Sequence, residues 1–390
     1  MLDLDLYTDP AAMRPALQSL RGLSSPVRRV DVLHAARRAP RRDPASRACR
    51  IAVCYRVETA ARGHEILYGK VYPSNVCAEL TAGTGAPPAP EWLREIDMIF
   101  WRFPQDPGLP QLGALLDGDT ELVRYRPEER ATLRRGELYA KTFRGDDGAE
   151  LCARFFSLQH MSVGLMAFEV ARPLEYDAST RTFWQQGIEA PALAEVITSG
   201  NCAALMALAA QGLAALHGAE PRFGPARSNA QLAAASLRRA AKIGRCMPRL
   251  GPQAQGIAEE IAGHVPAAAG EASVQIHGDF HMDQLRVREG RLVLFDLDEL
   301  SIGDPLEDLA SFVVKCPLRD ARLARQACAA LVEAYARCRP ALFDAARLGW
   351  HLSVQWLHKA SRAYVWQRPG WRAAAEEALA QAEQPRSVLT

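Results

Sequence analysis

One stretch, residues 272–310, constrains the fold of this chain most strongly, because it sets ionisable side chains directly after two short apolar runs. The runs are Ala272 to Ile276 and Leu292 to Phe295; turn residues bound both of them, which predicts two β-strands with Gly290 in the turn between them. The ionisable side chains that follow the two runs are His277, Asp279, His281, Asp296, Asp298 and Glu299. Strand ends bring carboxylates together without burying them in an apolar core, where unpaired charge is costly. Such a cluster would bind a divalent cation or hold a catalytic base.

Each of these residues also has a simpler interpretation. Asp and His directly after a strand are frequently turn formers or caps, and this explains any one of them taken alone. It explains the whole string less well, because ordinary turns do not need so many ionisable groups, here with a glycine between His277 and Asp279. The density of the cluster therefore favours a functional site.

The amino-acid sequence of this stretch resembles a known family signature. It consists of His277-Gly278-Asp279-Phe280-His281-Met282-Asp283-Gln284-Leu285, then Phe295-Asp296, then Gly303-Asp304-Pro305 with Asp308-Leu309-Ala310. This is similar to the signature of the aminoglycoside phosphotransferase and choline kinase-like family, nearest in motif to its maltokinase-like members. The resemblance implies an α+β, two-lobed protein-kinase-like fold: a small antiparallel-sheet N-lobe and a mainly helical C-lobe, here with an extra N-terminal α+β cap module.

The resemblance also implies roles for individual residues and for two ligands, ATP and Mg²⁺. Asp279 would be the catalytic base that orients the acceptor hydroxyl, and Asp296 would hold Mg²⁺ that bridges the ATP phosphates. Gln284 stands where the family usually has an Asn metal ligand, and its amide oxygen is still available. The side chains expected to support the site structurally are His277, His281 and Asp304.

A strand-and-helix pattern occurs twice in the first half of the chain. Residues Leu67 to Leu80 recur as Leu138 to Leu151 at an offset of 71 residues, and six of the fourteen aligned positions are identical, which indicates a duplication or a coincidence in a biased sequence. Each copy has Lys on the strand and Glu on the helix. In a kinase-like N-lobe such a Lys holds phosphates and pairs with the Glu of the next helix.

Lys141 with Glu150 fits that role better than Lys70, because the hinge and the catalytic loop follow the second copy directly. The alternative is that Lys141 is an edge-strand lysine on a solvated face. A hairpin, 122–127 and 131–134, precedes Lys141 and lacks a glycine-rich loop, so Arg126 or Arg130 would have to bind phosphate instead.

The predicted domain organisation has three parts: a cap module, 1–115; a kinase-like N-lobe with hinge, 116–189; and a helical C-lobe, 190–390. The Pro- and Gly-rich segment 103–110 reads as a linker. Strands are expected at 163–170 and 182–187, and the resemblance implies that the hinge backbone from Gln186 to Ile188 binds adenine. The aromatic residues of the last helices would line an acceptor pocket or, as is commoner, belong to the core: Trp350, Trp356, Tyr364, Trp366 and Trp371.

Composition excludes several classes of protein. With 47 Lys and Arg against 45 Asp and Glu, the net charge of +2 indicates neither a nucleic-acid partner nor a membrane surface. The 9 Cys form no Cys-x-x-Cys pair, and the N-terminus lacks the pattern of a signal peptide, so we expect a cytoplasmic protein. The most apolar long run, Cys202 to Leu216, contains Gln211 and is too short to span a bilayer. The sequence leaves the oligomeric state undetermined.

Three functions agree with these observations. The first is an ATP-dependent phosphotransferase that acts on a hydroxyl of a small molecule, such as a sugar, an aminoglycoside-like compound or an amino alcohol. The second is a catalytically weak pseudokinase that binds nucleotide or a partner protein, because the glycine-rich loop is missing and Gln284 replaces Asn. The third is a metal hydrolase that uses His277, Asp279, His281 and Asp296, which would leave the Lys-bearing strand unexplained.

Overall fold

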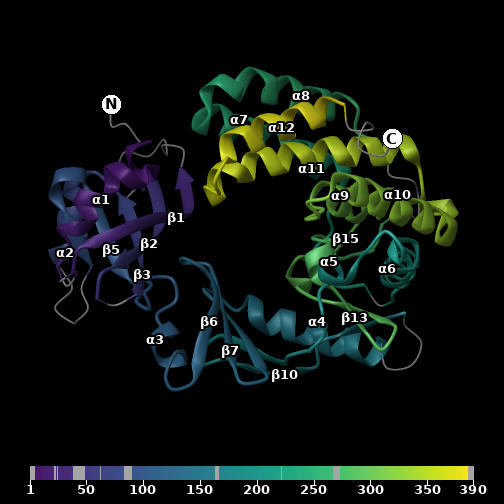
Figure 1. The fold of residues 1–390 in the computed structure, drawn as a ribbon, viewed down its shortest axis with the longest axis horizontal. Helices are drawn as coiled ribbons and strands as arrows, with labels where there is room; N and C mark the ends of the chain where they lie inside the picture. The colour runs from purple at the N-terminus through teal and green to yellow at the C-terminus, as the bar shows by residue number, and fades with distance from the viewer. Residues whose placement is uncertain are drawn as a thin grey trace.

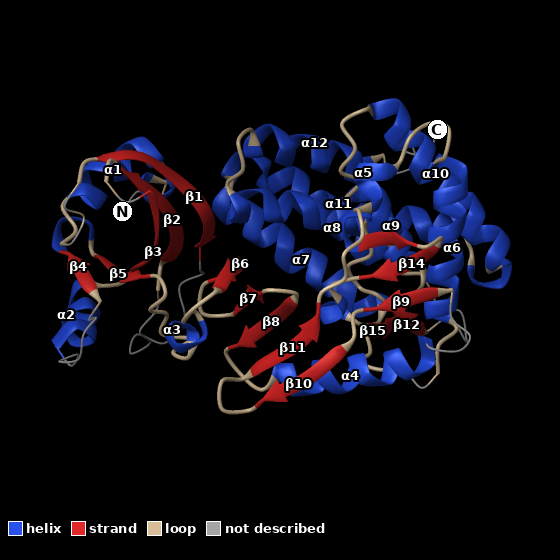
Figure 2. Ribbon diagram, turned by 60° about the horizontal axis from the view of Figure 1, so that its bottom comes forward, coloured by secondary structure: helices blue, strands red, loops and turns tan. Residues whose placement is uncertain are grey.

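The computed structural model describes residues 5–21, 23, 25–37, 49–61, 63–82, 90–162, 167–220, 222–266 and 273–384. Two five-stranded antiparallel sheets occupy the first half of the chain, and a large lobe built mainly of helices follows (Figures 1 and 2). The predicted α+β class, with a small antiparallel-sheet lobe and a mainly helical lobe, is therefore confirmed. In Figure 1 the elements form a ring in which β1 returns to the end of α11.

The first sheet has the strand order β1-β2-β3-β5-β4, with α1 packed on β1. Its elements are α1 (Pro10–Gln18), β1 (Val27–Arg37), β2 (Ile51–Thr59), β3 (Gly63–Val71), α2 (Ser74–Ala82), β4 (Glu91–Leu93) and β5 (Met98–Arg102). The helix α1 begins after Asp9, whose carboxylate accepts hydrogen bonds from the amides of Ala11 and Ala12, and Pro10 occupies its first turn.

The second sheet repeats this topology with the order β6-β7-β8-β11-β10. Its elements are α3 (Leu112–Leu115), β6 (Thr120–Arg126), β7 (Arg130–Arg135), β8 (Leu138–Phe143), α4 (Asp147–Ser162), β10 (Pro173–Asp177) and β11 (Thr182–Gln186). In both sheets a three-strand meander is followed by a helix and by two more strands, the last of which pairs with the third strand. The shared order supports the duplication inferred from the repeat.

Two strand predictions in the second half need correction. The strand β12 (Val274–Ile276) pairs with β15 (Ser301–Gly303), whereas β14 (Arg291–Leu294) pairs with β13 (Leu285–Arg288) and, in parallel, with β9 (Phe168–Val170). Gly290 therefore turns the chain between β13 and β14 and not between the two predicted strands. The reason is that the alternating segment Leu285–Arg288 forms a strand of its own, which was not predicted from the sequence.

The strand expected at 163–170 is also shorter than predicted. The helix α4 extends to Ser162, residues 163–166 lie outside the described part of the chain, and only Phe168–Val170 forms a strand.

The helical lobe surrounds α9, whose nine residues are all buried. Its helices are α5 (Leu193–Val196), α6 (Cys202–His217), α7 (Asn229–Cys246), α8 (Gly251–Gly263), α9 (Leu306–Val314), α10 (Ala321–Cys338), α11 (Ala345–Trp366) and α12 (Trp371–Glu383). Ser228 caps α7 in a capping box with Gln231, and Asp320 and Asp344 cap α10 and α11. Within the described residues, no helix has the length and apolar character needed to cross a membrane.

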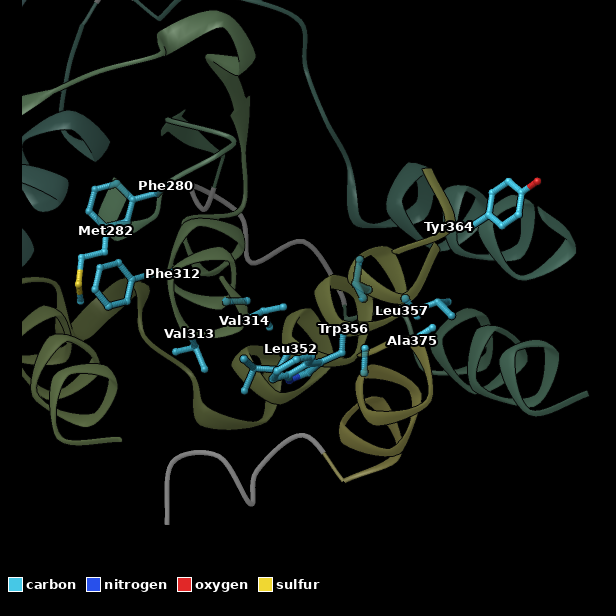
Figure 3. Close-up of a cluster of buried hydrophobic side chains, with 14 of the residues drawn as sticks. Phe280, Met282, Phe312, Val313, Val314, Leu352, Trp356, Leu357, Tyr364 and Ala375 are labelled. Atoms are coloured by element: carbon cyan, nitrogen blue, oxygen red, sulfur yellow. The ribbon is translucent and has the colours of Figure 1, made fainter. Parts of the chain in front are cut away.

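A hydrophobic core lies directly beneath the loop that follows β12 (Figure 3). The rings of Phe280 and Phe312 pack with centroids 5.8 Å apart, and Met282 lies beside them. Trp350, Trp356 and Tyr364 are buried in the core of the same lobe, as the commoner interpretation of the aromatic residues requires. Trp366 is only half-buried, at the end of α11.

Candidate active site

The loop after β12 is held by main-chain hydrogen bonds to one carboxylate. The amides of His277 and Gly278 donate to Oδ2 and Oδ1 of Asp308, at 2.8 and 2.9 Å, from the first turn of α9. Gly278 has a φ of 77°, and a Cβ there would lie 2.2 Å from the carbonyl oxygen of Glu299. Only glycine fits this position, which explains the residue between His277 and Asp279.

His277 joins this loop to the one that follows β14. Its Nε2 lies 2.9 Å from the carbonyl oxygen of Phe295, and its Nδ1 accepts a hydrogen bond from the amide of Asp279 at 3.3 Å. Both ring nitrogens are therefore used, and the proton resides on Nε2. The arrangement sets Asp279 and Asp296 on two loops that share one buried imidazole.

Asp308, which fixes this loop, is itself part of a buried network. Its Oδ2 lies 3.1 Å from Nε2 of His217, and Nδ1 of that histidine lies 2.6 Å from the hydroxyl of Tyr335. Burial alone would raise the pKa of Asp308, but the hydrogen bond and charge of His217 outweigh it and hold the pKa below the usual range. His217 is thus a buried residue at the end of α6 that packs within the protein.

Asp279 has 31% of its side chain exposed. Its carboxylate forms an ion pair with Lys315, which follows α9, and lies 3.8 Å from Nε2 of His281. Burial lowers the pKa of His281, which Asp279 only partly offsets. No pattern in the sequence marks Lys315, because its role depends on where α9 ends in space.

Asp296 lies directly after β14 and has a left-handed backbone with φ 53° and ψ 56°, which is uncommon for a residue other than glycine. Nζ of Lys141 donates to Oδ1 of Asp296 and to Oδ1 of Asp298, both at 2.6 Å. Nε2 of Gln284 donates to the other oxygen of Asp296 at 3.2 Å. The structure therefore brings together three of the predicted site residues, Lys141, Asp296 and Gln284.

The charges of this group stabilise one another. Burial would raise the pKa of Asp296, but the ammonium of Lys141 outweighs it and holds the pKa well below its usual value. Burial would likewise lower the pKa of Lys141, but Asp298 and Asp296 raise it above its usual value. Asp298 also forms an ion pair with Arg130. The sequence predicted it only as one of the carboxylates that follow the second strand.

The predicted ion pair between Lys141 and Glu150 is not formed. Glu150 pairs instead with Arg154, one turn further along α4, and its side chain is 67% exposed. Glu150 occupies the first turn of α4, at the wall of a pocket of about 520 Å³ that Asp298 also lines. Asp298 takes the place of the expected partner, because it follows a strand end that the fold places directly opposite β8.

The predicted hinge lies where β11 ends. The amide of Gln186 donates to the carbonyl oxygen of Arg172 at 2.9 Å, and that of Gly187 donates to Glu137 at 2.7 Å. These two donors are therefore occupied, which leaves Ile188 as the residue of the hinge to be tested for adenine binding.

Asp304 connects α9 to α11. Its carboxylate accepts a hydrogen bond from the amide of Leu306 at 3.0 Å and lies 3.1 Å from Nε of Arg347 and 3.4 Å from Nε2 of His351. Burial would raise the pKa of Asp304, but His351 and these other donors lower it. Asp304 is therefore a buried residue beneath the site and is not exposed at its surface.

Lys70 of the first sheet contacts the second sheet. Its ammonium pairs with Glu128, in the turn of the β6–β7 hairpin, and the hydroxyl of Tyr68 donates to the same carboxylate at 3.0 Å. Asp106, in the segment predicted as a linker, accepts from the amide of Glu128 at 2.8 Å. The first lysine of the repeat therefore holds the hairpin that precedes the second lysine.

The donor set agrees with Mg²⁺ better than with a protein-built metal site. Among the described residues, no group of three His, Cys, Asp or Glu side chains is arranged to hold a metal ion. Mg²⁺ needs no such cage, because it takes one or two carboxylates with substrate phosphates and water. Asp296 and Gln284, which are in hydrogen-bond contact, would be the residues that hold it. The metal-hydrolase reading loses support, because His277 uses both ring nitrogens within the protein.

Comparison with known proteins agrees with this site. The sequence model of the phosphotransferase enzyme family matches residues 128–341, which is more than half of the chain and includes both loops. The chain belongs to this phosphotransferase family. The match begins in the turn of the β6–β7 hairpin and leaves the first sheet outside it. No curated protein matches the chain.

The chain also resembles solved structures of a choline/ethanolamine kinase family protein and of aminoglycoside phosphotransferases. A choline/ethanolamine kinase family protein from Mesorhizobium loti is 17% identical, with 71% of this chain and 90% of that chain covered and a TM-score of 0.46. The aminoglycoside phosphotransferase APH(3'')-Id from Streptomyces rimosus is 19% identical, with 64% and 96% covered and a TM-score of 0.46. The GDP complex of aminoglycoside 2'-phosphotransferase-IIIa is 13% identical, with 71% and 97% covered and a TM-score of 0.48.

The family resemblance stated from the sequence is thus confirmed. The nearer likeness to maltokinase-like members stays a prediction.

Proposed function

We propose that this protein is an ATP-dependent phosphotransferase that moves the γ-phosphoryl group to a hydroxyl of a small molecule. The observation that carries the proposal is the convergence of Lys141, Gln284 and Asp296 at the end of β14, beside a loop that presents Asp279. This is the arrangement of charge that phosphoryl transfer needs, since such enzymes act mainly by positioning and by charge neutralisation.

Each residue has a distinct role in the proposed reaction. Asp279 accepts the hydrogen bond of the acceptor hydroxyl, orients its oxygen toward the γ-phosphorus and takes up the proton. Lys141 neutralises the nucleotide phosphates from β8, and the hinge at Ile188 binds adenine. Mg²⁺ bound by Asp296 and Gln284 would supply further neutralisation of phosphate charge. His277, His281 and Asp304 keep the two loops in place.

The three-part organisation is proposed along with this function. Residues 1–115 form the cap module, 116–189 the kinase-like N-lobe with its hinge, and 190–390 the C-lobe that carries both loops. The acceptor would be a sugar, an aminoglycoside-like compound or an amino alcohol.

A second candidate is a catalytically weak pseudokinase that binds nucleotide or a partner protein. It is favoured by the ion pair between Lys315 and Asp279, which occupies the carboxylate needed as a base. The turn of the β6–β7 hairpin also carries Glu128 and Glu129 where other kinases have a glycine-rich loop.

ATP turnover separates the two candidates. The purified protein, with Mg²⁺ and ATP, is expected to show a higher melting temperature and ADP release that an acceptor stimulates. A panel of sugars and amino alcohols, with the product identified by mass, names the acceptor class. ATP binding without stimulated ADP release would favour the pseudokinase, and absence of both would contradict the phosphotransferase proposal.

A further inference from the structure

Three arginines from two separate elements surround one tryptophan ring at the junction of the lobes. The guanidinium carbons lie 4.9 Å from the ring centroid of Trp366 for Arg362, 5.5 Å for Arg126 and 5.9 Å for Arg124. Arg362 and Trp366 are four residues apart on α11, whereas Arg124 and Arg126 come from β6. Guanidinium groups that stack on an aromatic face keep their N–H edges free for other partners.

Two further cations join this group from α7. Arg239 and Lys242 are three residues apart and so lie on one face of α7, a helix that packs on α11. We call Arg126, Arg239, Lys242 and Arg362 the cationic cluster.

Carboxylates of the described chain act on the cationic cluster only from a distance: Glu129 on Arg126 and Arg362, Asp279 and Glu299 on Arg362, and Glu307 on Arg239. None of its four members has an ion pair within 4.0 Å in that part of the protein, although all four side chains are half-buried. Nε of Arg126 is buried and has no hydrogen-bond partner among the described residues. Taking several like charges partly out of water without a counter-ion is unfavourable, and a bound anion would remove that cost.

The pKa values in the cluster agree with a shortage of negative charge. Burial and the neighbouring arginines lower the pKa of Arg126 to about 10 against the opposing charge of Glu129, and burial lowers that of Arg239 to about 10 although Glu307 partly offsets it. The pKa of Lys242 falls for the same reasons. The guanidinium groups nevertheless stay protonated at neutral pH, so the cluster is cationic when a ligand arrives.

The cluster borders the proposed catalytic centre. Nη1 of Arg124 lies 3.9 Å from Asp296, and the charge of Asp279 acts on Arg362, whose pKa burial otherwise lowers. The face of α11 that carries Arg362 also carries His358, which the charge of Lys315 influences, and Lys315 is the partner of Asp279. The cationic cluster therefore lies next to the residue proposed to orient the acceptor hydroxyl.

We propose that the cationic cluster binds the acceptor, and that the acceptor is an anionic small molecule carrying a carboxylate or a phosphate ester besides its reacting hydroxyl. This inference rests on the proposed phosphotransferase function and narrows its acceptor class. It excludes the cationic acceptors among the compounds considered above, because aminoglycosides and amino alcohols would be repelled by four unpaired cations.

The nucleotide phosphates are the competing occupant, and the arrangement of the elements disfavours them. The proposed nucleotide residues, Lys141 on β8 and Ile188 after β11, belong to the second sheet and its edge. In Figure 1, α7 and α11, which carry three of the four members of the cluster, lie across the ring from β10 and α4, and only Arg126 comes from the second sheet. Lys141 and Arg130, which belong to that sheet, form ion pairs with a carboxylate of the site. The proposed nucleotide-binding side therefore has cations of its own.

The test compares matched acceptors and matched arginine variants. The acceptor pairs are glucose with glucuronate and glycerol with glycerol phosphate, and choline serves as a cationic compound. The wild-type protein should use or bind the anionic member of each pair about 10- to 100-fold better than the neutral one. Arg362→Met should abolish this preference while leaving the KM for ATP within about twofold. Arg372→Met is the control, because Arg372 also stacks on a tryptophan, Trp371 at 4.4 Å, but is exposed on α12.

Each outcome decides the question. Equal use of neutral, anionic and cationic acceptors would overturn the proposal, as would an Arg362→Met variant that raises the KM for ATP and keeps the acceptor preference. Lys242→Met provides a second variant if Arg362→Met fails to fold, as judged by its melting temperature. Calorimetric titration of glucuronate and glycerol phosphate tests binding independently of turnover. Binding that depends on Arg362 without any transfer would contradict the phosphotransferase function but support the anion site.

Discussion

At the scale of single residues, His277 determines how the two loops of the site lie relative to each other. It bonds to the main chain of both loops, through the carbonyl of Phe295 and the amide of Asp279, from a fully buried position. Asp279 therefore has a fixed main chain but an ion-paired side chain, held by Lys315. Its backbone position does not depend on its carboxylate.

Replacing Asp279 by Asn should thus remove the base and preserve the site. We expect Asp279→Asn to lower kcat by roughly 10²- to 10⁴-fold, because the amide cannot take the acceptor proton. ATP binding, measured by calorimetric titration, should change little. Asp283→Asn is the control, since Asp283 is more exposed and lies 3.8 Å from His281 on its other side. Loss of nucleotide affinity in Asp279→Asn would show that its role is misassigned.

The two lysines of the repeat should respond differently to substitution. Lys141→Ala leaves Asp296 and Asp298 without their ammonium partner, and we expect kcat/KM for ATP to fall by about 100-fold. Lys70→Ala should weaken ATP use much less, because Lys70 contacts Glu128 and not the site. Steady-state kinetics at varied ATP measure both. The reverse order would refute the choice of Lys141.

At the scale of elements, the duplicated sheet explains how the hairpin over the site is held without a glycine-rich loop. Its turn, at Glu128, has a positive φ of 60° and is tied to the first sheet by Lys70 and Tyr68. The aromatic rings of Tyr68, Tyr72 and Trp101 lie 5.6, 5.9 and 5.7 Å from the same ammonium. One sheet therefore acts as a support for the β6–β7 hairpin of the other.

Neutralising Glu128 should consequently loosen the hairpin. We expect Glu128→Gln to lower the free energy of unfolding by about 1–3 kcal/mol, because Lys70 is left partly buried without a counter-charge. The KM for ATP should rise as well, since the hairpin would no longer be fixed. Urea unfolding and kinetics check the two effects. Glu129→Gln, at the adjacent exposed position, should change neither; equal effects at both positions would contradict the tether.

At the scale of the whole molecule, the first sheet contacts both lobes and closes the ring seen in Figure 1. It contacts the small lobe through Lys70 and Glu128 and the large lobe through His34 of β1, whose ring lies 5.6 Å from that of Trp366. His34 faces the cations Arg126 of β6, Lys242 of α7 and Arg362 of α11. Burial and these charges lower the pKa of His34 to about 4.

Stability should therefore depend on pH through His34. In the unfolded chain His34 takes up a proton near its ordinary pKa of about 6.5, whereas the folded protein resists protonation until about 4. The free energy of unfolding should thus decrease as the pH falls from about 6.5 to 4. Urea unfolding over that range should show a smaller decrease for His34→Gln, while His64→Gln, at an exposed site on β3, should keep the wild-type dependence. An unchanged pH dependence in His34→Gln would contradict the contact.

Much of the site was predictable because local signals encode it. Asp279 and Asp296 follow strand ends, Gly278 fits a backbone that only glycine adopts, and Lys141 lies on a strand that the repeat marks. The fold class followed from the same motif. The partner of Lys141 was predicted wrongly, because Glu150 and Asp298 are both acidic residues near a strand in sequence, and only the ion pairs that Lys141 forms in the folded chain show which one is near.

By itself, then, the sequence determined the family, the two-lobed α+β class and the two loops of the candidate site, since each of these depends on residues within a few positions of one another. Only the tertiary structure decided the partners: Lys315 for Asp279, Asp298 for Lys141, Lys70 for Glu128, and the cationic cluster of β6, α7 and α11. A chain with a net charge of +2 gives no sign of that cluster, because the excess charge arises locally, where residues distant in sequence are packed side by side.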